Sequence, residues 1–272
     1  MNRGQTIRRL AAAAIAIAAL WAQTSLVGQQ TAAVPQATAA KAKPASSPAP
    51  APAAAPVAAE SGRFVVLLDA AHGGDDAGAH LANSAAEKTV TLALSVRLRS
   101  LLAARGVTVV TTREDNSTLD ADARALKANR AAPAACLSLH ATESGEGVHL
   151  FVSSLAPAAA ANFAAWKTAQ AAWVTRSLSL ASTVNSTLER SAQGDTPAEA
   201  VAIPVLLART SLPGLDSMSC PALGIELAPL RSADGKVSVE VTDASYESRV
   251  VDALAAAVLS WRGDWQTKGH QP

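Results

Sequence analysis

The chain has 272 residues, of which 49% are hydrophobic and 17% charged, and a formal net charge of +1 at pH 7. A charge so close to zero does not point to a charged partner. No basic run with interleaved aromatic residues occurs, so nucleic acid is excluded as an expected partner.

The amino terminus has the pattern of an export signal. Arg3, Arg8 and Arg9 precede an apolar run from Leu10 to Ala22, which is shorter than the roughly 20 residues of a membrane span. Residues 1–28 are therefore expected to be either a signal peptide or an N-terminal anchor that tethers the chain to a membrane. Both interpretations predict an exported protein, periplasmic or associated with the cell envelope.

The next segment, residues 29–61, is rich in Ala and Pro and has almost no large apolar side chain. Such a composition cannot bury enough surface to offset the entropy of ordering, so we expect a disordered linker. Residues 62–262 have the size and apolar content of one catalytic domain, and residues 263–272 are expected to form a flexible tail.

Within that domain, stretches typical of strands alternate with stretches typical of helices. Strands are expected at 64–68, 107–112, 135–140, 148–152, 205–207 and 223–227, and helices at 87–105, 120–132, 157–190 with one or two breaks, and 246–261. This alternation predicts an α/β fold with a mostly parallel central sheet of about six strands and helices on both faces.

Polar residues follow the strands at the edge where sites of such sheets gather, the carboxyl ends. His72 follows the first strand, His140 ends the third, Glu226 lies near the end of 223–227, and Glu87 begins the first helix. Two histidines and a glutamate are a catalytic zinc donor set that leaves one position for water, which indicates a hydrolase. The alternatives are that Glu87 is a helix-starting acid and Glu226 an ion-paired carboxylate.

Other polar and aromatic residues near these positions allow two interpretations each. Asp69 could accept the second ring N–H of a ligand histidine, or cap the loop backbone. His80 and His149 are expected on the surface or on a strand face rather than as ligands. Trp166 and Trp173 are expected to pack in the core rather than to stack on sugar rings.

Cys136 and Cys220 are the two cysteines of the chain. Export would place them in an oxidising compartment where a disulfide is allowed. A disulfide and a pair of small buried thiols both remain open.

Several motifs resemble those of one enzyme family when read in order. They are LLDAAHGGDDAGA, EKTVTLAL, RALKANRA, SLHA and PALGIEL, spread over about 64–261. In this order they resemble the zinc-dependent N-acetylmuramoyl-L-alanine amidases of the amidase_3 type.

The resemblance implies that His72, Glu87 and His140 hold Zn²⁺ and that Glu226 is the catalytic acid/base. It further implies that the partner is peptidoglycan, cut at the amide between N-acetylmuramic acid and L-alanine. A protein activator of unknown identity is compatible with this interpretation.

Some segments depart from the family pattern. Ala71 stands where glycine is usual, and a positive φ there would strain the loop. Residues 227–231 replace a glycine-containing loop, and 157–216 has no firm counterpart. The alternatives are therefore a catalytically impaired peptidoglycan-binding or regulatory module, or another zinc peptidase of the cell wall.

Overall fold

The structure is a computed structural model that describes residues 63–158, 166–191 and 202–268. All of these belong to one of two units of the chain, 56–272, and the other unit, 1–55, lies outside them. The expected signal peptide or anchor (1–28) and the expected linker (29–61) also lie outside the described residues. Among the helices that are described, none is both long and apolar enough to span a membrane.

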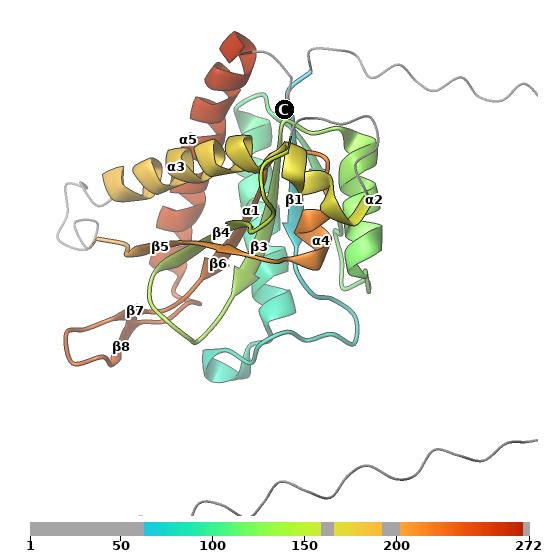
Figure 1. Cartoon of the computed structure of the whole chain (residues 1–272). Helices are drawn as coiled ribbons and strands as arrows, with labels where there is room; N and C mark the ends of the chain where they lie inside the picture. Colours follow the sequence, from blue (N-terminus) through green and yellow to red (C-terminus); the bar gives the residue numbers. More distant parts are fainter. Residues whose placement is uncertain (1–62, 159–165, 192–201, 269–272) are drawn as a thin grey trace, which may run out of the picture. The chain divides into compact units, whose positions relative to one another are not determined.

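A six-stranded sheet forms the centre of the domain (Figure 1). Its strands are β1 (Val65–Ala70), β2 (Thr108–Thr111), β3 (Ala135–Ala141), β4 (Val148–Ser153), β5 (Val205–Thr210) and β6 (Ala222–Leu227), in the order β2-β1-β3-β6-β4-β5. The strands β2, β1, β3 and β6 are parallel, whereas β4 is antiparallel to β6 and parallel to β5. The mostly parallel sheet is confirmed. The reversal of β4 was not predicted, and it follows from a β3–β4 connection too short for a crossover helix.

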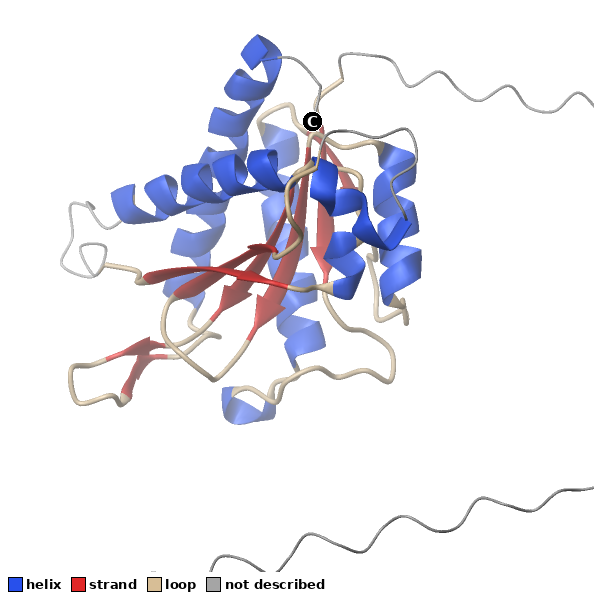
Figure 2. Cartoon of the chain, in the orientation of Figure 1, coloured by secondary structure: helices blue, strands red, loops and turns tan. Residues whose placement is uncertain are grey.

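Helices cover both faces of the sheet (Figure 2). They are α1 (Glu87–Ala104), α2 (Ala121–Ala131), α3 (Val174–Arg190), α4 (Pro213–Asp216) and α5 (Ala244–Lys268), with the 3₁₀ segments η1 (Ala82–Ser84) and η2 (Trp166–Ala172). A hairpin of β7 (Leu230–Arg231) and β8 (Val237–Val239) follows β6 and was not expected. The helical stretch expected over 157–190 corresponds to η2 and α3, and residues 159–165 of that stretch lie outside the described residues.

The strand residues alternate between two cores, because successive side chains in a strand point to opposite faces. Leu68, Leu137 and Ile225 belong to the main core, which α1, α3 and α5 cover. Leu67 and Cys136 belong to a smaller core on the other face, beside α2 and α4. Polar residues continue that second face toward the carboxyl ends of the strands, and this places the functional site there.

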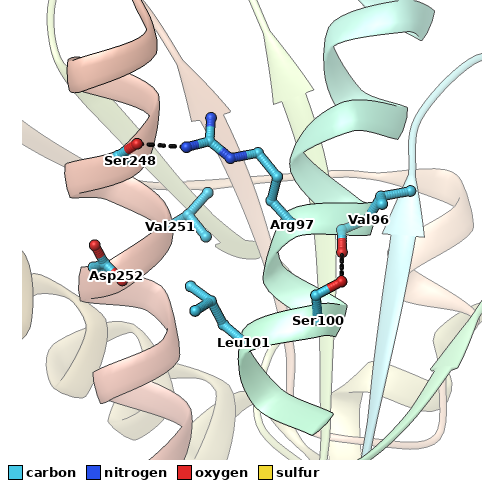
Figure 3. A pocket seen from close by; sticks show the side chains of 7 residues that line it. All are labelled: Val96, Arg97, Ser100, Leu101, Ser248, Val251 and Asp252. Atoms are coloured by element: carbon cyan, nitrogen blue, oxygen red, sulfur yellow. Dashed lines mark hydrogen bonds between the residues drawn. The ribbon is translucent and has the colours of Figure 1, made fainter. Parts of the chain in front are cut away.

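The last helix extends beyond the expected end of the domain. Residues 263–268 are helical, not a flexible tail, because Trp265 is buried in the main core together with Trp261. The helix α5 also packs against α1, where Arg97 donates a hydrogen bond to Ser248 (Figure 3). Arg97 donates a second one to Glu247 at 2.8 Å. These helices line a cavity of about 370 Å³ that shares no lining residue with the site described below.

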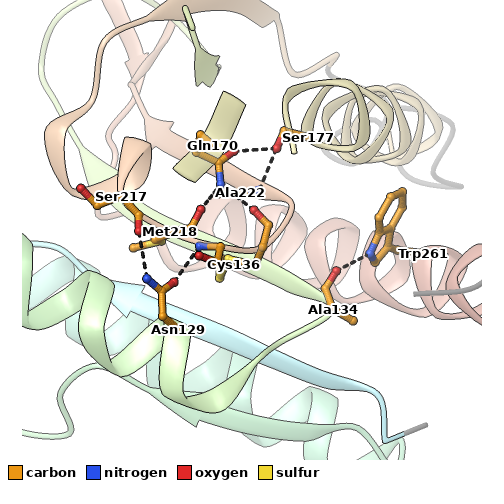
Figure 4. Close-up of a disulfide and its surroundings, with 11 residues drawn as sticks. Asn129, Ala134, Cys136, Gln170, Ser177, Ser217, Met218, Ala222 and Trp261 are labelled. Carbon is orange, nitrogen blue, oxygen red and sulfur yellow. Dashed lines mark hydrogen bonds between the residues drawn. A yellow bond between two sulfur atoms is a disulfide. The ribbon is translucent and has the colours of Figure 1, made fainter. Parts of the chain in front are cut away.

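Cys136 and Cys220 form a disulfide, so the open choice between a bridge and two thiols is settled (Figure 4). It joins the start of β3 to the segment before β6, and both cysteines are fully buried. The buried side chain of Gln170, in η2, donates hydrogen bonds to the carbonyls of Met218 and Cys220 at 2.7 and 2.6 Å. The segment before β6 is thus fixed from two sides.

The two tryptophans near η2 differ in burial. Trp173 packs against the main core, as expected. Trp166 is 40% exposed, so the expectation of core packing is wrong for it. The difference arises because the two residues do not lie on one continuous helix. Trp166 lies in η2, and Trp173 directly precedes α3.

Candidate metal centre and its cavity

The loop after β1 presents His72 through an unusual backbone. His72 has φ +61°, in the left-handed region, whereas Ala71 is not among the described residues with positive φ. The strain of a left-handed backbone therefore falls on His72 and not on Ala71. Two buried arginines stabilise this turn, because Arg124 donates to the His72 carbonyl at 2.7 Å and Arg113 to the Ala71 carbonyl at 2.9 Å.

His72, Glu87 and His140 come together at the carboxyl edge of the sheet. Nε2 of His72 lies 3.1 Å from Oε2 of Glu87, and Nδ1 of His140 lies 3.0 Å from Oε1. All three candidate ligand atoms lie within 4.8 Å of one another. The imidazole rings are perpendicular, with centroids 5.5 Å apart. A loop, the first residue of α1 and the end of β3 each supply one side chain.

Backbone amides fix both carboxylate oxygens of Glu87. The N–H of Ala79 donates to Oε2 at 2.8 Å, and the N–H of Ala141 donates to Oε1 at 3.1 Å. Burial raises the pKa of Glu87, but the hydrogen bonds from His140 and from these two amides outweigh it, so that the pKa lies below its usual value. Glu87 is therefore ionised at neutral pH, and it is more than a helix-starting acid.

Asp76 orients His72. Its Oδ2 lies 2.8 Å from Nδ1 of His72, and its Oδ1 accepts the N–H of Gly78 at 3.0 Å. The bond to His72, with that from Gly78, lowers the pKa of Asp76. A proton on Nδ1 that is donated to Asp76 leaves the lone pair on Nε2, the nitrogen that faces Glu87.

Asp69 does not contact a candidate ligand histidine. Its carboxylate accepts hydrogen bonds from Thr112, Arg124 and Ser138, at 2.7, 2.6 and 2.8 Å. The first interpretation offered by the sequence, a partner for a ligand histidine, is therefore wrong, and Asp76 has that position. The reason is the turn after β1, which carries the His72 ring out of contact with Asp69 in β1.

The donor set fits a zinc ion. Two imidazole nitrogens and one carboxylate oxygen are the ligands of many catalytic zinc sites. Glu87 is buried and ionised, and Asp76 fixes the nitrogen that His72 presents. Gly78 leaves room, because a Cβ there would lie 2.6 Å from Oε2 of Glu87 and 2.6 Å from Cδ2 of His72.

Glu226 lies in the same cavity as the two histidines. This cavity measures about 660 Å³, and its polar lining includes His72, Asp76, Ser138, His140 and Glu226. His140 and Glu226 are register partners in the parallel pair β3 and β6, so their side chains lie side by side on one face. The apolar lining of the cavity comes from Phe151, Leu212, Pro213, Leu215 and Met218.

Glu226 makes one contact that was not predicted from the sequence. His149 is buried, with 8% of its surface exposed, and its Nδ1 lies 2.8 Å from Oε2 of Glu226. His149 and Glu226 face each other in the antiparallel pair β4 and β6. His149 is thus on a strand face, as expected, and His80 is exposed, as expected. The sequence did not show that β4 pairs with β6, and this pairing brings the two residues together.

Comparisons with known proteins agree with these observations. The family model Amidase_3, described as N-acetylmuramoyl-L-alanine amidase, matches residues 66–260. Among solved structures, the amidase Ami1 from Mycobacterium smegmatis is similar, with 22% identity, a TM-score of 0.57, and coverage of 75% of this chain and 98% of that one. No curated protein matches the chain.

Two further solved structures have similar values. The catalytic domain of the amidase CwlV from Bacillus (Paenibacillus) polymyxa var. colistinus has 19% identity and a TM-score of 0.54, and the match covers 73% of this chain and 97% of that one. An amidase from Clostridium difficile 630 has 21% identity and a TM-score of 0.53, with coverage of 74% and 97%. At this identity the likeness shows a common fold.

Proposed function

Since the chain belongs to the N-acetylmuramoyl-L-alanine amidase family, we propose that it is a zinc enzyme that hydrolyses the amide between N-acetylmuramic acid and L-alanine in peptidoglycan. One observation carries the proposal. His72, His140 and Glu226 line one cavity, and the buried Glu87 lies within ligand distance of both histidines, so four separate segments contribute to one site. A binding module would not need this combination of ligands and acid/base.

His72, Glu87 and His140 would hold the ion. A bound zinc supplies Lewis-acid polarisation of the scissile carbonyl and lowers the pKa of water to about 7. The chain's own contribution is to hold the ligands in place, through Asp76 on His72 and through the amides of Ala79 and Ala141 on Glu87. These contacts keep the donor atoms oriented before any substrate binds.

Glu226 would move the proton. Its side chain is 28% exposed, at the cavity wall beside His140, so a water molecule and a substrate amide can both approach it. As general base it takes the proton of the attacking water, and as general acid it gives that proton to the nitrogen of L-alanine. The C–N bond then breaks and releases a neutral amine, together with the lactyl carboxylic acid.

The proposed location is outside the cytoplasm, in the periplasm or at the cell envelope. Peptidoglycan is located there, and the buried disulfide Cys136–Cys220 is suited to an oxidising compartment. Residues 1–28 would direct export or anchor the chain, and residues 29–61 would link that segment to the catalytic domain. Mass spectrometry and amino-terminal sequencing of the exported protein would distinguish cleavage from anchoring.

Single substitutions test the assignment of roles. His72→Ala and His140→Ala should lose bound zinc and activity together, whereas Glu226→Gln should keep zinc and lose turnover on purified peptidoglycan. His80→Ala is the matched control, since it removes an exposed imidazole outside the cavity and should keep both. Full activity of Glu226→Gln would overturn the assignment, and release of D-alanine would indicate another zinc peptidase.

A further inference from the structure

The contact between His149 and Glu226 distinguishes the two oxygens of the proposed acid/base. Oε2 of Glu226 is bound to Nδ1 of His149 at 2.8 Å. Within the described parts of the chain, Oε1 accepts no hydrogen bond. One oxygen is therefore committed to the protein, and the other is left for a reacting molecule.

The imidazole of His149 is itself held in place. The Phe151 ring packs against it edge to face, with centroids 6.2 Å apart. The backbone of Gly145 also lies close to the ring, since a Cβ there would come within 2.5 Å of Cε1 and 2.6 Å of Nε2 of His149. The Gly145 φ of +80° is one that glycine adopts without strain. The ring therefore has little freedom to turn away from Glu226.

An arginine that follows Glu226 in the chain secures the loop over His149. Arg231 donates to the Gly145 carbonyl at 2.8 Å and to the Glu143 carbonyl at 2.9 Å. Arg231 belongs to β7, in the segment where the sequence departs from the family pattern. The segment that differs from the family pattern therefore stabilises the loop that packs against His149.

We infer that His149 is a positioning residue that holds Glu226 through Oε2, so that Oε1 faces the substrate amide. The inference rests on the proposed function, because it gives Glu226 the acid/base role. His149 touches no reacting atom and acts through Glu226. A free glutamate side chain samples several rotamers, and a displacement of about 1 Å can cost about 100-fold in rate.

Two substitutions separate positioning from packing. His149→Asn keeps a nitrogen donor at about the place of Nδ1 but removes the ring, and His149→Leu fills much of the same space without a donor. We measure kcat and KM on a soluble N-acetylmuramoyl tripeptide, along with zinc content and thermal unfolding. His80→Ala is the control for the loss of an imidazole, and Glu226→Gln gives the rate without the acid/base.

Positioning predicts that His149→Leu loses about 10- to 100-fold in kcat with KM and zinc content unchanged, and that His149→Asn stays within about threefold of the wild type. Equal rates for wild type and His149→Leu would overturn the inference and leave the proposed function intact. A parallel loss in both variants, with lower stability or less zinc, would overturn it in favour of packing. A wild-type chain without amidase activity would overturn the proposed function as well.

Discussion

Replacement of Gly78 by alanine should damage the metal centre without touching any of its ligands. A Cβ at this position would lie 2.6 Å from Oε2 of Glu87, 2.6 Å from Cδ2 of His72 and 2.8 Å from Cβ of Glu87. Ordinary contact begins at 3.4 Å, so these neighbours must move by about 0.6 to 0.8 Å. Metal and catalytic sites tolerate about 0.5 Å of displacement. We therefore expect zinc affinity to fall about 10- to 100-fold, or about 1.4–2.8 kcal/mol.

The backbone of Gly78 adds a second cost that must be separated from the first. Its φ of +66° is in the left-handed region, where alanine costs roughly 1–2 kcal/mol. Gly106 is a matched control, because it has φ +72° and a Cβ added there would meet nothing within 4 Å. Gly106→Ala should lose only the stability that this backbone cost accounts for and keep wild-type zinc affinity.

The assay is a competition titration of each variant with a chromophoric zinc chelator, alongside urea unfolding of the zinc-free proteins. The expected result is that both variants are destabilised, Gly78→Ala at least as much as Gly106→Ala, and that only Gly78→Ala loses zinc affinity. Wild-type zinc affinity of Gly78→Ala would refute the reasoning. So would an equal loss of affinity in Gly106→Ala, which would make backbone strain the cause.

Two other contacts give predictions of the same kind. Asp76→Ala should weaken zinc binding about 10- to 100-fold, because it removes the carboxylate that orients His72. The zinc affinity of Asp76→Asn should lie between those of Asp76→Ala and the wild type. Asp75→Ala changes an exposed neighbour and should match the wild type in the same titration. Cys136→Ala/Cys220→Ala should lower the free energy of unfolding by about 2–4.5 kcal/mol, because the bridge closes a loop of 84 residues. An unchanged urea midpoint would show that the disulfide does not constrain the unfolded chain.

Sequence patterns predicted those parts of the site that depend on local order. The apolar run before Asp69 marks β1, and the helical spacing after Glu87 marks α1, so the positions of His72 and Glu87 relative to the sheet followed from the chain itself. His140 and Glu226 followed from the rule that parallel strands end at one edge. In each case the side chain lies next to a helix or strand that a short stretch of sequence is enough to predict.

Contacts that depend on long-range pairing were not predictable in this way. His149 meets Glu226 because β4 runs antiparallel to β6, and the alternation of apolar residues in β4 is the same for either direction. Asp76, not Asp69, meets His72 because His72 itself has a left-handed backbone. A positive φ at a histidine has no local sequence signal, and the short connection before β4 gives the direction of that strand but not its pairing with β6.

The most direct test of the account is digestion of purified peptidoglycan by the full-length protein, with and without a chelator and after zinc is restored. Mass spectrometry reads the newly freed amino termini of the stem peptides. The account predicts release of L-alanine amino termini that stops with chelator and returns with zinc. Release that is insensitive to chelator, or no release by a folded protein shown to contain zinc, would contradict it.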